Sequence, residues 1–131
     1  MREQPYEKLK FYQVICEIRK MVYSLTEKFD RSNLRLVSQM KDAARSAKQN
    51  IREGYRRGSL GHMINGIRIS QGSLEELSGD MEDCAEDKLI TENEYKKFEE
   101  LYQSAMYLSS RYIQTMSKSE NKEKWKTMGK E

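Results

Sequence analysis

Apolar residues recur along most of this chain at alternating steps of three and four residues, the repeat that places side chains on one face of an α-helix. The pattern predicts four helices, at about residues 5–29, 34–57, 59–88 and 92–117. After Ser117 the repeat is lost and the sequence is polar, so residues 118–131 are expected to form a flexible tail. Trp125 is interpreted as part of this loose tail, with docking on the helices as the alternative.

Residues that start or stop helices stand at the boundaries of these segments. Pro5 suits the first turn of a helix, because its missing N–H would have no partner there. Gly58 and Ser59 are typical of a helix end followed by the N-cap of a new helix. Thr91 and Glu94 have the spacing of a capping box. The boundaries therefore favour separate helices joined by short connections.

Beyond their first turns, the predicted helices contain four glycines: Gly54, Gly66, Gly72 and Gly79. A glycine in a helix interior costs about 1 kcal/mol relative to alanine. Close approach of a neighbouring helix is the usual compensation, and we expect it at these positions. Asn50, one turn before Gly54, is a candidate for a buried hydrogen bond.

Four amphipathic helices with short connections predict a single all-α domain, an antiparallel up-and-down four-helix bundle. A chain of 131 residues with one Pro fits this fold. Because no apolar run approaches the length of a membrane span and the N-terminus has no signal-peptide core, a cytoplasmic location is expected. Several residues off the main repeat either cover a partner subunit or lie on the flanks of the bundle: Tyr12, Tyr23, Ile69, Tyr102 and Tyr107.

The residues needed for catalysis or metal binding are scarce. His62 is the single histidine, so the paired Glu-x-x-His motifs of a di-iron bundle are absent from the sequence. Cys16 and Cys84 have no zinc-ligand spacing and are expected to be free thiols. The third predicted helix carries a row of carboxylates, interpreted as a solvated face or as one that pairs with a basic partner: Glu76, Asp80, Asp83 and Asp87. We therefore expect no enzymatic activity and no cofactor or metal.

Basic residues form a sharper pattern on the second predicted helix. A row at steps of four, three, four and four consists of Lys41, Arg45, Lys48, Arg52 and Arg56, and Arg35 and Arg57 lie near its two ends. Residues 31–72 contain nine Lys and Arg against two Asp and Glu, whereas residues 73–103 contain three against eleven. Such a row attracts phosphate backbones. The alternative is that these cations pair with the acidic face of the third helix, in the same or a neighbouring subunit.

Two short motifs resemble a known family. The segments "AARSAKQNIREGYRRGS" and "GSLEEL" are similar to those of bacterial four-helix-bundle proteins first noticed as reading frames within intervening sequences of 23S ribosomal RNA genes. That family also includes the accessory variability proteins (Avd) of diversity-generating retroelements. The matching positions are Gln39, Met40, Ala43, Ala44, Ser46, Asn50, Ile51, Glu53, Gly54, Arg57, Ser59, Gly72, Ser73, Leu74, Glu76 and Leu77. Where the family usually has Ile-Pro this chain has Ala47-Lys48, which predicts a more regular and more basic helix.

The resemblance implies a homopentameric barrel of bundles with a basic surface. In the retroelement branch it implies an accessory protein that binds reverse transcriptase and template RNA. The alternative is an intervening-sequence-encoded bundle that acts as a protein-only assembly module without nucleic-acid binding. The strengthened basic row favours the first function, with RNA or DNA as the partner.

Overall fold

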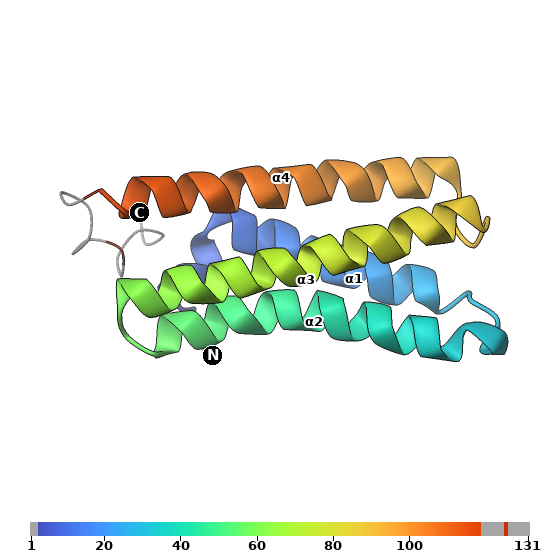
Figure 1. Ribbon diagram of the computed structural model, residues 1–131, viewed down its shortest axis with the longest axis horizontal. Helices are drawn as coiled ribbons and strands as arrows, with labels where there is room; N and C mark the ends of the chain where they lie inside the picture. The colour runs from blue at the N-terminus through green and yellow to red at the C-terminus, as the bar shows by residue number, and fades with distance from the viewer. Residues whose placement is uncertain (1–2, 119–124, 126–131) are drawn as a thin grey trace.

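The computed structural model describes residues 3–118 and Trp125, and within them the chain is helical with no strand. The four main helices are α1 (Lys10–Thr26), α2 (Leu34–Arg56), α3 (Leu60–Glu86) and α4 (Glu92–Met116). Figure 1 shows that successive helices run in opposite directions, with connections at alternating ends of the bundle. Each helix packs on the next and α1 closes the ring against α4, so α2 and α4 lie diagonally opposite. The expected four-helix bundle is therefore confirmed.

The first helix is shorter than the sequence predicts, at both of its ends. Pro5–Lys8 forms a separate 3-10 turn (η1), and Leu9 is extended (φ −69°, ψ 131°) before α1 begins. At the other end, the hydroxyl of Thr26 donates to the carbonyl oxygen of Val22 at 2.8 Å, within the last turn of α1. The repeat extended to residue 29 because Phe29 is half-buried, although it lies in the connection and not in the helix.

The predicted caps are present at the two later connections. Gly58 has the positive φ of 83° that glycine adopts easily, and Ser59 accepts a hydrogen bond from the N–H of His62 at 3.1 Å. Thr91 and Glu94 form both bonds of a capping box, at 3.1 and 2.9 Å. These caps satisfy N–H groups that have no partner inside a helix.

The helices α2 and α3 cross most closely at a pair of glycines. A Cβ atom on Gly54 would lie 2.7 Å from the carbonyl oxygen of His62 and 3.2 Å from the Cα of Gly66. A Cβ atom on Gly66 would overlap the carbonyl oxygen of Asn50. The close approach expected at Gly54 and Gly66 is confirmed.

Gly72 and Gly79 do not serve the same purpose. Both lie on the exposed side of α3, and a Cβ atom on either would meet no atom within 4 Å. The expectation of close helix approach there was wrong within this chain, because these positions point away from α2 and α4.

Polar side chains add to the α2–α3 contact. The hydroxyl of Ser70 donates to the carbonyl oxygen of Ala47 at 2.6 Å, and Ser46 and Ser73 share a hydrogen bond of 3.0 Å. Asn50 donates to the carbonyl oxygen of Ser46 at 2.8 Å, so its hydrogen bond lies within α2 and is only partly buried.

The core contains mostly aliphatic residues and methionine, and among the motif positions it includes Leu74 and Leu77. Trp125 is 6% exposed and packs edge-on against Tyr55 of α2, with ring centroids 5.6 Å apart. This residue therefore docks on the helices, the alternative to its place in a loose tail. Apart from Lys118 and Trp125, the tail predicted at 118–131 lies outside the described residues. In the described part of the chain, no helix is long and apolar enough to cross a membrane.

Candidate nucleic-acid interface

Five basic residues of α2 lie along the flank of that helix that faces α1. They are Lys41, Arg45, Lys48, Arg52 and Arg56, called here the basic row. Their spacing keeps them on one side of a helix with about 3.6 residues per turn. Two contacts with tyrosines of α1 show that this side of α2 faces α1. Lys41 lies over the ring of Tyr23, and Arg52 interacts with the hydroxyl of Tyr12. Arg45 and Arg56 are exposed, whereas the other members of the basic row are partly buried.

One tyrosine of α1 holds two cations at one end of the row. The ammonium group of Lys41 lies 5.0 Å from the centre of the Tyr23 ring, and the guanidinium of Arg19 lies 4.5 Å from it. A cation over an aromatic ring is stabilised by about 0.5–1 kcal/mol at a partly exposed site. Tyr23 therefore brings a positive charge from α1 beside the basic row.

A second tyrosine positions Arg52 further along the row. Burial, reinforced by the neighbouring Cys16, raises the pKa of Tyr12 to about 12, and the interaction with Arg52 partly opposes this rise. Burial works to lower the pKa of Arg52, but contacts with the hydroxyl groups of Tyr12 and Tyr6 outweigh it and raise that pKa. Arg52 thus remains charged and is oriented by neutral partners that leave its charge uncompensated.

Two of the predicted site residues lie apart from the row. Arg35 lines a hollow between α2 and α3, together with Leu34 and Gln39. Arg57 follows the last residue of α2 with helical φ and ψ, and the helical rotation of about 100° per residue places it off the side that carries the row. Nearness in the sequence suggested one site for all seven residues, but the rotation of the helix separates these two from it.

Two acidic residues of α3, Asp80 and Glu76, lie beside the opposite flank of α2. Asp80 accepts hydrogen bonds from the amide of Gln39 at 3.0 and 3.1 Å, and Glu76 lines the same α2–α3 hollow. Burial raises the pKa of Asp80, an effect that Gln39 opposes and the nearby Asp83 and Glu76 reinforce. The α3 carboxylates therefore crowd one another instead of neutralising the basic row.

No member of the basic row forms an ion pair with a carboxylate in the part of the chain that the structure describes. The two ion pairs there are Lys8 with Glu3 and Lys28 with Glu94, both at 3.9 Å. Pairing of the row with the acidic face of α3 within one chain, one of the two alternatives left open by the sequence, is thus absent from these residues.

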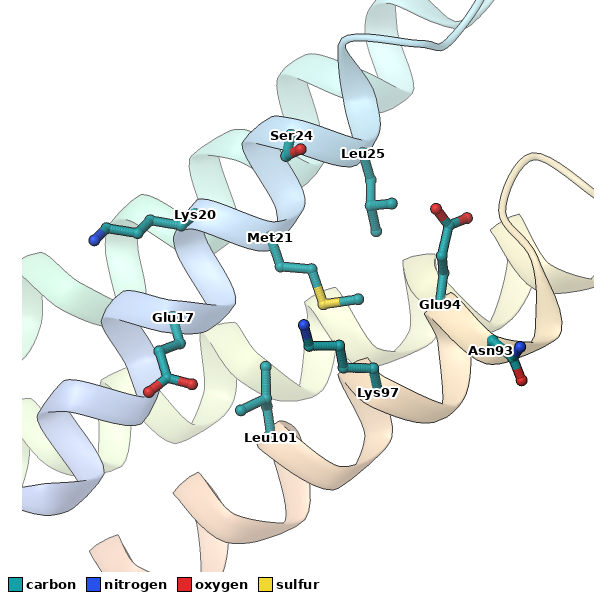
Figure 2. A pocket seen from close by; sticks show the side chains of 9 residues that line it. All are labelled: Glu17, Lys20, Met21, Ser24, Leu25, Asn93, Glu94, Lys97 and Leu101. Atoms are coloured by element: carbon teal, nitrogen blue, oxygen red, sulfur yellow. The ribbon is translucent and has the colours of Figure 1, made fainter.

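Another hollow lies on the seam between α1 and α4 and has a volume of about 580 Å³. Figure 2 shows Met21, Leu25 and Leu101 pointing into the space between α1 and α4, with Lys97 reaching between Met21 and Leu101 and Lys20 pointing away. It is an open apolar depression with a mixed-charge rim. Over residues 3–118 and Trp125, no group of three His, Cys, Asp or Glu side chains is arranged to hold a metal ion.

Sequence reasoning missed Arg19. Tyr12 was expected either to cover a partner subunit or to lie on a flank of the bundle, but it is 5% exposed and packs edge-on against Tyr6 within the chain. Tyr23 is half-buried beneath its two cations. The available signal was the i, i+4, i+7, i+11 spacing of Tyr12, Cys16, Arg19 and Tyr23, which defines a second face on α1.

The fold and its surface define a small all-α protein, an up-and-down bundle with one basic flank and one acidic flank. The family model of 23S rRNA-intervening sequence proteins matches residues 7–111, and the chain belongs to that family. This confirms the family expected from the two motifs. A comparison with curated proteins finds no match.

Proposed function

We propose that this protein is a non-enzymatic, oligomeric accessory protein of the cytoplasm that binds nucleic acid through the basic row. The observation that supports this proposal is a line of five cations on one helix flank, none of them paired with a carboxylate among the described residues. Uncompensated charges in a line create a positive potential that attracts phosphates. The partner is RNA or DNA, and a reverse transcriptase is the protein partner that the Avd resemblance suggests.

Assembly into a homopentamer is part of the proposal. It rests on the family resemblance and is supported by apolar side chains that the single chain leaves exposed: Leu34 at 72%, Tyr107 at 61% and Ile69 at 46%.

A second candidate function is a protein-only assembly module, and the arrangement of charge favours it as the alternative. The basic and acidic flanks lie on opposite sides of α2, so the basic flank of one copy can face the acidic flank of the next. Contacts of this head-to-tail type close into rings when the rotation between copies permits.

Charge reversal at the three row positions with no ring contact separates the two functions. The variant Arg45→Glu, Lys48→Glu, Arg56→Glu leaves Lys41 and Arg52 on their tyrosines. A matched control, Lys10→Glu, Lys20→Glu, Lys97→Glu, changes the net charge equally but on exposed positions along the α1–α4 seam.

Binding to a labelled RNA and sedimentation velocity are measured on both variants. The proposal predicts that only the row variant loses RNA binding while its sedimentation matches that of the wild type. Dissociation of the row variant into monomers supports the assembly module instead. Equal loss of RNA binding in both variants would reflect net charge and contradict a site on the row.

A further inference from the structure

The aromatic rings beside the basic row are all engaged within the chain. Tyr6 is 3% exposed and Tyr12 is 5% exposed. The ring of Tyr23 is covered by Arg19 and Lys41, and the ring of Tyr55 packs against those of Tyr6 and Trp125, at 5.2 and 5.6 Å. Along the described part of this surface, no ring is free to stack on a nucleic-acid base.

The exposed aromatic residue Tyr107 is on a different face. It lies on α4, in the hollow that also contains Leu9 and Arg111, and α4 is diagonally opposite α2 in the bundle. A strand bound along the basic row therefore cannot reach Tyr107 without crossing α1.

The row itself is straight and rigid. From Lys41 to Arg56 it spans about 22 Å at about 1.5 Å per residue. A double helix presents about one phosphate charge per 1.7 Å of axis, against about one per 3.4 Å for one strand. A rigid cation row without stacking partners therefore gains more from a duplex, which is already straight over this length, than from a single strand that must be ordered.

We infer that the basic row recognises the phosphate backbone of double-stranded nucleic acid and does not bind single strands through their bases. This inference rests on the proposed nucleic-acid binding and deepens it by naming the form of the ligand. Single-strand binders without sequence preference depend on stacking platforms worth about 1–3 kcal/mol per base, and the row offers none. Arg19 and Tyr23 are positioning residues in this surface, because the ring holds both Arg19 and Lys41 toward the ligand.

Fluorescence anisotropy with two labelled probes tests the inference on the full-length protein. One probe is an RNA duplex of about 20 base pairs, about three times the length of the row, and the other is a single strand of uridines with the same number of phosphates. The duplex is expected to bind at least about fivefold more tightly, because its charge density is about twice as high. Equal or tighter binding of the single strand overturns the inference and leaves the proposed function standing. Failure of the protein to bind either probe overturns both.

Tyr23→Leu provides a second test that does not depend on the absolute affinity. Loss of the ring releases Arg19 and Lys41, so the affinities for the duplex and the single strand are expected to fall by the same factor. A fall confined to the single strand would show that the ring stacks on bases, and it would overturn the inference.

Discussion

The close crossing of α2 and α3 predicts opposite effects on stability for two glycines of α3, because Gly66 is confined by α2 and Gly72 is open. Gly66→Ala places a methyl group against the backbone of Asn50 and within 3.1 Å of the Cα of Gly54. Neither backbone atom can rotate away, so the two helices must separate. Overpacking costs about 1–3 kcal/mol, and overlap with a backbone oxygen places this substitution in the upper half of that range, at about 2–3 kcal/mol. The gain in helix propensity returns about 1 kcal/mol.

We therefore expect Gly66→Ala to lower the free energy of unfolding by about 1–2 kcal/mol. Gly72→Ala, six residues further along α3, meets no atom within 4 Å and should raise it by about 0.5–1 kcal/mol. For a chain of this size about 1 kcal/mol corresponds to about 4 °C in Tm, so the two variants should differ by about 6–12 °C.

Thermal and urea unfolding, followed by far-ultraviolet circular dichroism, measure both variants. A Gly66→Ala variant as stable as the wild type would refute the close crossing. A Gly72→Ala variant that is destabilised, with a Tm that depends on protein concentration, would show that a second copy packs on this face of α3 in solution.

Two further predictions concern a helix cap and a thiol. Ser59→Ala removes the acceptor for the N–H of His62 and should lower the free energy of unfolding, measured in urea, by about 1 kcal/mol. Ser59→Asp should restore most of that stability. Equal stability of all three proteins would contradict the cap. Cys84 is fully buried, and burial together with the nearby Asp80 and Asp83 raises the pKa of its thiol to about 11. In a Cys16→Ser variant, where Cys84 is the remaining cysteine, its alkylation at pH 9 should therefore be far slower than that of a free thiol. Because the thiol stays protonated in the folded state, its contribution to stability is complete below pH 9 and declines as the pH rises toward 11. Rapid labelling of Cys84 at pH 8, read by mass spectrometry of the native protein, would contradict this burial.

Local patterns in the sequence were enough to predict the bundle and its caps. The apolar repeat identified four helices because each buries one face, and Ser59, Thr91 and Glu94 act through neighbours three residues away. The break at Leu9 escaped prediction because Pro5, which set the predicted start, suits the first turn of a short 3-10 helix as well as that of an α-helix. The different roles of Gly66 and Gly72 also escaped, since they depend on which side of α3 faces α2.

The candidate site was only partly predictable for the same reason. The spacing of Lys41 to Arg56 placed five cations on one flank of α2. It could not show that Arg35 belongs to the α2–α3 hollow, nor that Arg19 joins the row through Tyr23, because that contact is made between two helices. The position of Asp80 and Glu76 on the far flank of α2 is likewise a property of the packing.

The dependence of RNA affinity on salt tests phosphate binding by the row most directly. With five phosphate contacts, the logarithm of the affinity for an RNA duplex should fall with the logarithm of salt concentration with a slope of about −4 to −5. Arg45→Gln and Arg56→Gln should each reduce the magnitude of this slope by about one, whereas Lys97→Gln on the α1–α4 seam should leave it unchanged. A slope near zero, or one that responds equally to all three substitutions, would contradict the account.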